Sequence, residues 1–139
     1  MMKDAVSVLR FHTYSVDEMI YRRNYEFFSS EQEIELDFHL EAKAILSDGN
    51  DKSIIILTCK IFSDDFEKNN APFYLKTTVR GFFTCSEGVN IEDFQFHGMA
   101  ILLPYVRSII TSFTAQSGIN PVILPPINVY KVFGKSETE

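Results

Sequence analysis

Residues 98–133 read GMAILLPYVRSIITSFTAQSGINPVILPPINVYKVF, an apolar segment followed by one interrupted by prolines. The first half repeats apolar side chains at i, i+3, i+4 and i+7 spacing, which is the pattern of an amphipathic helix. This predicts one long helix over 98–117 with a wide apolar face. Gly118 ends it, because glycine readily adopts the left-handed conformation that follows a helix. Pro104 either kinks the helix or marks where its regular part begins.

The second half cannot continue the helix. Pro121, Pro125 and Pro126 lack an amide donor, and each disfavours helical backbone in the residue before it. We therefore expect an extended apolar loop over 119–133 that closes in a short helical turn. The remaining residues, 134–139, form a polar tail.

Four earlier segments alternate apolar and polar side chains, as strands with one buried face do. Gly81 inside the last of them indicates either a bulge or another backbone packed close by. Four antiparallel strands over 5–86 followed by a long helix make a two-layer α+β fold, and 139 residues suit one such domain. The predicted strands are 5–14 (or, with a bulge, 5 to about 20), 33–46, 53–62 and 73–85.

The composition limits the classes of function. A net charge of −6 argues against general nucleic-acid binding, which needs a basic surface. Cys59 and Cys85 are out of register on neighbouring predicted strands, so we expect two free thiols. The N-terminus has no secretory pattern, and no apolar run approaches the roughly 20 residues that span a bilayer. We therefore expect a cytoplasmic protein without membrane insertion.

Catalytic chemistry is not indicated. The sequence has no glycine-rich phosphate loop, nucleophile elbow or Walker motif. His12, His39 and His97 are dispersed, so we expect no metal site. The carboxylates that alternate along residues 33–41 are interpreted as a solvated strand face, which needs no function. We predict neither an enzyme nor a cofactor.

The apolar side chains exceed what a small two-layer domain can bury. One sheet face covers only one side of the helix, so the wide apolar stripe needs a second partner. We therefore expect an oligomer in which helices pack between sheets of different subunits. The helix residues expected at this oligomer interface are Met99, Leu102, Val106, Ile109, Ile110 and Phe113.

Residues 21–30 read YRRNYEFFSS, where aromatic side chains are interleaved with Arg22 and Arg23. One interpretation is an ordered, aromatic-rich crossover that presents its rings for binding. The other is a loop whose aromatic side chains close the edge of the core.

The segment 101–110, ILLPYVRSII, resembles the I-L-F-P-Y-A-R-E-x-I motif of the SecB family of export chaperones. Gly118 matches the glycine that ends the family's helix, and 121–129 matches its P-x-L-x-L-x-P-x-N-F segment. Residues 73–83 match the phenylalanine and glycine pattern of its fourth strand. The order of strands, helix and apolar tail extends the resemblance over almost the whole chain.

The resemblance implies an ATP-independent chaperone, a holdase, that binds unfolded polypeptides or preproteins in apolar grooves. It also implies a homotetramer that is a dimer of dimers. The groove walls are the crossover after the first strand, the main helix and the loop that follows it. Carried onto this chain, the peptide-binding residues are Tyr21, Tyr25, Phe27, Phe28, Leu124, Ile127, Val129, Tyr130 and Phe133.

The departures from the family concern its partners. Family members dock on the motor protein SecA through acidic residues of the outer sheet face and a longer C-terminal helix. Here Lys76 stands at the acidic position, and the C-terminal helix is about one turn long. Client binding therefore carries over better than SecA docking. Some SecB-like proteins protect the antitoxin of a toxin–antitoxin system, so the alternative is a chaperone dedicated to one such partner.

Overall fold

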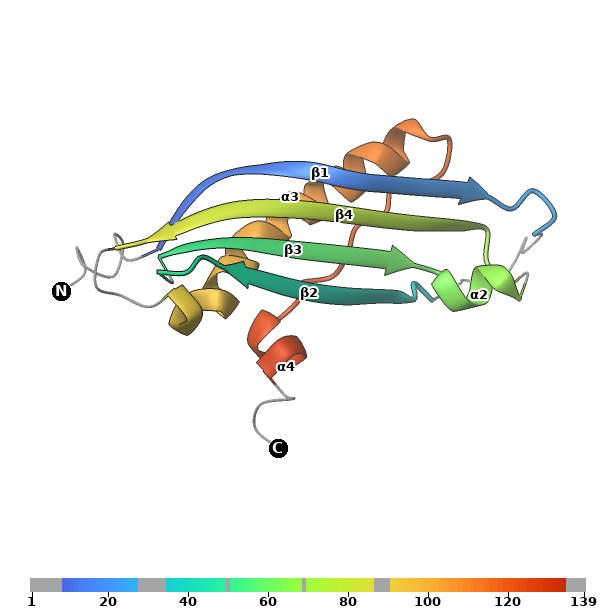
Figure 1. Ribbon diagram of the computed structural model, residues 1–139. Helices are drawn as coiled ribbons and strands as arrows, with labels where there is room; N and C mark the ends of the chain where they lie inside the picture. The colour runs from blue at the N-terminus through green and yellow to red at the C-terminus, as the bar shows by residue number, and fades with distance from the viewer. Residues whose placement is uncertain (1–8, 28–34, 50, 69, 87–90, 135–139) are drawn as a thin grey trace.

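The computed structural model describes residues 9–27, 35–49, 51–68, 70–86 and 91–134. These residues form a four-stranded sheet, a long helix and shorter helical segments (Figure 1). In chain order the elements are β1 (Leu9–Arg23), β2 (Phe38–Leu46), β3 (Lys52–Ile61), α2 (Ser63–Glu67), β4 (Phe73–Cys85), the 3-10 helix η1 (Ile91–Phe94), α3 (Gln95–Gln116) and α4 (Val129–Gly134).

The sheet has the strand order β1-β4-β3-β2, and every neighbouring pair is antiparallel. α3 crosses one face of this sheet diagonally, and the loop after α3 returns along the same side to α4 (Figure 1). The described residues thus form a sheet layer and a helix layer, which confirms the predicted α+β fold. β1 and β2 are the two edge strands.

The alternation of side chains along each strand determines which of them face α3. Along β3 and β4, each second residue is buried and the residues between are half-buried. Ile55, Leu57 and Val79 lie on the buried face, so the strictly alternating strands cover the helix as the sequence predicts.

α3 packs closely on the sheet because glycines lie at the contacts. A Cβ at Gly81 would lie 3.0 Å from Leu102 Cδ1, and one at Gly98 would lie 2.6 Å from Ile55 Cδ1. β4 keeps its register through Gly81. The glycine therefore marks close packing of α3 rather than a bulge.

By length and composition, α3 could cross a membrane, so the expectation that no segment is long enough was wrong. In this structure the helix lies on the sheet instead. Its Leu102, Val106 and Ile110 side chains have no exposed surface. The helix is apolar because it is the core helix of the domain.

Several boundaries differ from the predictions. β1 continues to Arg23, with register shifts between Phe11 and Thr13 and between Val16 and Glu18, so the bulged alternative was correct. The crossover therefore begins at Asn24 rather than at Tyr21. Among the described residues, β2 begins at Phe38 rather than at residue 33. Residues 5–8, 28–34 and 135–139, which the sequence predictions also cover, lie outside the described part.

The helical segments also differ in detail. α2 is a short helix in the connection from β3 to β4, which the strand predictions leave open. α3 begins at Gln95, before the predicted 98, because η1 leads directly into it, and it continues through Pro104. The helix ends where expected, with Gly118 at φ +93°. α4 is the predicted terminal turn.

The two cysteines lie apart, as the strand register requires. Cys59 is opposite Thr77, and the amide of Cys85 donates to the carbonyl oxygen of Asp51 at 2.8 Å. Within the described residues neither cysteine forms a disulfide, as the sequence predicts.

Candidate functional site

The loop between α3 and α4 is held on α3 by polar side chains spaced along one side of the helix. The Thr114 hydroxyl accepts a hydrogen bond from the Val122 amide at 2.8 Å. Thr111 Oγ1 donates to the Val122 carbonyl oxygen at 2.7 Å, and Arg107 Nη2 donates to that of Leu124 at 2.9 Å. The prolines of the loop prevent it from forming a helix of its own. Its backbone N–H and C=O groups therefore form hydrogen bonds with side chains of α3.

The side chains of this loop alternate between core and solvent. Val122 and Leu124 are buried at 9% and 1% exposure, whereas Ile123 between them is 73% exposed. Val129, the first residue of α4, is also buried. The loop is therefore half core and half exposed apolar surface.

Hollows flank the loop on both sides. One of about 390 Å³ lies between α3 and the loop, with Leu103 and Ile127 in its lining. Another of about 500 Å³ lies between the loop and the edge strand β2, where Phe38, Leu40 and Val132 line it. Both linings are largely apolar, so this region offers concave surface on which an apolar segment could pack.

The end of β1 and the crossover that follows it carry a second aromatic group. Tyr21 is half-buried, and its ring meets Phe113 of α3 edge-on at 5.4 Å between centroids. Tyr25 is 80% exposed, with the Arg23 guanidinium 5.5 Å from its ring centroid. Asn24 anchors the turn, since its amide donates to the Pro72 carbonyl oxygen at 2.8 Å. Each interpretation of the crossover therefore fits a different residue: Tyr21 closes the core edge, and Tyr25 is presented to solvent.

The predicted peptide-binding residues separate into three environments. Leu124 and Val129 are in the core, while Tyr21, Phe27, Ile127 and Phe133 are half-buried. Tyr25 and Tyr130 are exposed, and Phe28 lies outside the described residues. Arg23 approaches Gly118 at the start of the loop, whereas Tyr130 packs near Phe96 beyond its end, at 5.9 Å. The two aromatic groups therefore lie at opposite ends of the loop.

The predicted oligomer-interface residues of α3 lie mainly inside the subunit. Met99, Leu102, Val106 and Ile110 are buried, and Ile109 and Phe113 are half-buried. Side chains without exposed surface cannot contact a second copy unless the packing changes. Of the predicted set, the half-buried Ile109 and Phe113 retain the most surface for such a contact.

The outer face of the sheet is charge-balanced. Lys76 Nζ lies 3.0 Å from Glu18, Arg80 Nε donates to Asp17 at 2.8 Å, and Lys60 pairs with Glu41 at 3.2 Å. The hydrogen bond from Arg80 lowers the pKa of Asp17, and the hydrogen bond to Glu18 raises the pKa of Lys76. Acids of the edge strands are thus neutralised by bases of the inner strands.

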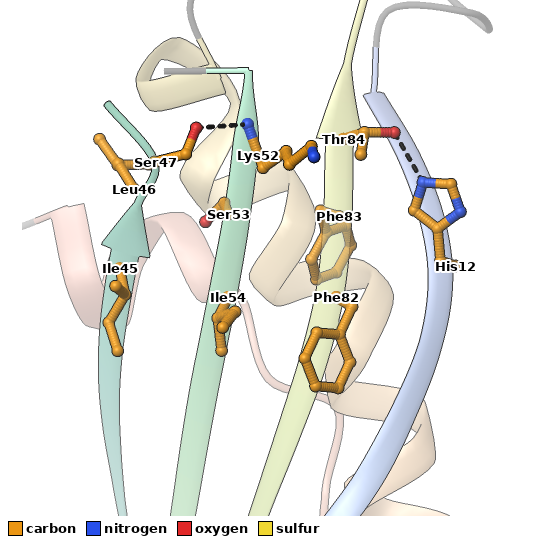
Figure 2. Close-up of a pocket in the computed structure, with 10 residues that line it drawn as sticks. All are labelled: His12, Ile45, Leu46, Ser47, Lys52, Ser53, Ile54, Phe82, Phe83 and Thr84. Atoms are coloured by element: carbon orange, nitrogen blue, oxygen red, sulfur yellow. Dashed lines mark hydrogen bonds between the residues drawn. The ribbon is translucent and has the colours of Figure 1, made fainter. Parts of the chain in front are cut away.

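A further hollow of about 390 Å³ lies at one end of the sheet (Figure 2). Ile45, Ile54 and Phe82 form one row of register partners across three strands, and His12 Nε2 lies 2.6 Å from Thr84 Oγ1. None of the predicted peptide-binding residues lines it. In the sequence, this hollow is indicated by the run of isoleucines in β3, which makes the strand apolar on both faces.

The chain is similar to known proteins in sequence and in fold. No protein-family model matches the chain. The chain is 36% identical over 127 residues to the uncharacterized protein MJ0357 of Methanocaldococcus jannaschii, covering 87% of this chain and 79% of the relative. It is 27% identical over 118 residues to the protein-export protein SecB of Magnetococcus marinus, covering 82% and 73%.

A solved structure has the same fold. The Mycobacterium tuberculosis Rv1957 SecB-like chaperone, in complex with a ChAD peptide from the Rv1956 HigA1 antitoxin, superposes with a TM-score of 0.68. The two share 11% identity, over 88% of this chain and 93% of the other. The chain has a SecB-like fold, and its sequence is similar to that of a SecB protein. Its SecB-like fold confirms the family resemblance of the helix and loop motifs.

Proposed function

We propose that the chain is an ATP-independent holdase that binds unfolded polypeptides or preproteins in apolar grooves beside the loop after α3. The observation that carries this proposal is the exposed apolar surface of that region. Ile123 is 73% exposed, Tyr130 55% and Val132 48%, next to the hollows on both sides of the loop. Exposed apolar surface of this kind is typical of a site for another protein.

The rigid, apolar character of these side chains suits clients of varied sequence. Aromatic rings and prolines accept many apolar partners at low entropic cost, and the free edge of β2 offers backbone groups to an extended chain. Tyr25 at the crossover extends the same kind of surface to the other end of the loop.

The alternative is a chaperone dedicated to one partner, such as an antitoxin. The structural neighbour Rv1957 is in complex with an antitoxin peptide, which supports this alternative for a chain of the same fold. Affinities for unrelated unfolded peptides separate the two. A broad, weak profile favours the general holdase, and one tight ligand favours the dedicated chaperone.

We further propose a cytoplasmic homo-oligomer, a tetramer built as a dimer of dimers, without a catalytic activity or a cofactor. On α3 the exposed Tyr105 stacks near Tyr14 of the edge strand β1 at 4.8 Å, so apolar surface remains on that side of the subunit. The mass in solution tests the assembly, and a monomer would contradict it.

Docking to SecA is proposed to be weak or lost. The outer sheet face pairs its acids with Lys60, Lys76 and Arg80, and this leaves little net negative charge for a basic partner. Purified SecA should therefore not be retained by the immobilised protein, and stoichiometric retention would contradict this.

The holdase activity is tested by the aggregation of a denatured test protein. A stoichiometric amount of the wild-type oligomer should suppress it without nucleotide. Phe27→Asp should weaken the suppression while the oligomer stays intact. If the wild-type protein leaves the aggregation of every client unchanged, the holdase proposal is wrong.

A further inference from the structure

Arg107 is a half-buried cation with most of its hydrogen-bonding capacity unused. A guanidinium has five N–H donors, and among the described residues Arg107 donates one hydrogen bond, from Nη2 to the Leu124 carbonyl oxygen at 2.9 Å. Its Nε is buried without a hydrogen-bond partner, and no carboxylate within the described ranges forms an ion pair with it. Lys60, Lys76 and Arg80 on the outer face of the sheet, in contrast, have acidic partners.

The position of Arg107 is also distinctive. It lines two hollows along the seam between α3 and the loop, one of about 390 Å³ toward α4 and one of about 310 Å³ toward the C-terminal end of α3. Apolar side chains such as Leu103 and Ile127 line the first, and neutral ones such as Thr111 and Ile123 line the second. Among the described residues that line these two hollows, Arg107 is the one with a charged side chain.

A carboxylate is the ligand chemistry that fits this cation. Attraction between opposite charges is stronger beside apolar surface than in open water, because the local dielectric constant is lower. Arginine can also bind a carboxylate through two parallel N–H donors, which gives direction as well as strength. The bond from Nη2 to the Leu124 carbonyl oxygen already holds the guanidinium in the seam, so little side-chain entropy would be lost on binding.

We infer that the seam between α3 and the loop binds an extended polypeptide segment in which an aspartate or glutamate side chain meets Arg107. This inference rests on the proposed holdase function and names a chemical preference within its clients. Because a hollow lies on each side of Arg107, the bound chain continues in both directions. The carboxylate is therefore a side chain within an apolar segment rather than a chain end.

A preference for acidic clients is the opposite of what the net negative charge of the protein predicts. A net charge of −6 repels acidic ligands at long range, so composition alone predicts that acids weaken binding. An acidic preference would therefore have to come from a local cation.

The test uses fluorescent apolar peptides that differ at one central position. The first peptide carries aspartate, the second asparagine, and both have blocked ends; a third carries asparagine and a free C-terminal carboxylate. Fluorescence anisotropy with the wild-type protein should show about tenfold tighter binding of the aspartate peptide, a difference that decreases at high salt.

Two variants test whether Arg107 causes the preference for the aspartate peptide. Arg107→Gln should remove the difference between the aspartate and asparagine peptides while still binding both. Lys43→Gln, which removes one exposed charge from the outer side of β2, should keep the difference. The wild-type comparison decides the question even if the Arg107 variant does not fold.

The outcomes separate this inference from the proposed function. Equal binding of all three peptides by the wild-type protein leaves the holdase intact and overturns the Arg107 site. Tighter binding of only the peptide with a free C-terminal carboxylate overturns the assignment to an internal side chain. If none of the peptides binds, both the holdase proposal and this inference are wrong.

Discussion

The buried amide of Val122 donates a hydrogen bond to Thr114 Oγ1 across 2.8 Å, so a helix hydroxyl supplies what a neighbouring strand would supply in a sheet. The same hydroxyl donates to the Ile110 carbonyl oxygen at 2.8 Å, which orients it toward the loop. Thr114 has no exposed surface. One side chain therefore connects α3 to the exposed apolar segment.

Replacing Thr114 by valine should destabilise the protein by about 1–3 kcal/mol, because the buried Val122 amide loses its acceptor while the side-chain volume stays similar. Urea unfolding followed by circular dichroism measures the change. Thr114→Ser is the matched control, since it keeps the hydroxyl, and it should unfold nearer to the wild type. Equal midpoints for the valine variant and the wild type would show that the bond contributes nothing.

Replacing Gly81 by alanine should destabilise by about 1–3 kcal/mol through overpacking against α3. The added Cβ would lie 3.0 Å from both Leu102 Cδ1 and Phe83 Cε1. The same substitution should cost less in a Leu102→Ala background, where one of the two neighbours has been removed. Additive costs in the two backgrounds would contradict a direct contact.

Burial raises the pKa of Cys59 from 9.0 to about 12. The thiol stays protonated in the folded protein at pH values where the unfolded chain ionises. Its contribution to stability is therefore complete below about pH 9 and is lost as the pH rises toward about 12. Unfolding free energies measured between about pH 8 and pH 11 should decrease more steeply for the wild type than for Cys59→Ala. Parallel profiles would argue against a buried, protonated thiol.

Tyr25→Asp should raise the concentration that halves client aggregation by about fivefold, because an exposed ring is replaced by a charge at the crossover. Stability should hardly change, since Tyr25 is 80% exposed. Ile45→Asp is the control, an exposed apolar residue on the other side of the sheet that no proposed groove contains. If both variants lose the same activity, binding follows general surface hydrophobicity instead of the grooves.

Much of the fold could be predicted because alternation is a local signal. The bounds of β4 agree with the prediction, since each residue of 73–85 has its face set by the two-residue period. β1 was harder, because its two bulges shift the period and the run to Arg23 loses its regularity. The start of α3 was also missed, since Phe94 provides no side-chain cap that would mark it.

The candidate site was less predictable than the fold. Residues 119–128 have apolar side chains except at Asn120 and Asn128, and their sequence does not show which ones point into the core. That choice depends on the bonds from Thr111, Thr114 and Arg107, which fix the backbone orientation of the loop. Leu124 and Val129 therefore became core residues, and Ile123, which was not predicted as a site residue, became the exposed one.

The strand order has a consequence for synthesis on the ribosome. The first strand pairs only with the last, since Leu9 is opposite Cys85 and Arg23 opposite Phe73. The N-terminal strand must wait, without its partner, until nearly two thirds of the polypeptide has been made, and contacts so distant in sequence form slowly. During that interval the nascent chain exposes apolar surface of the kind that the finished protein is proposed to bind in others.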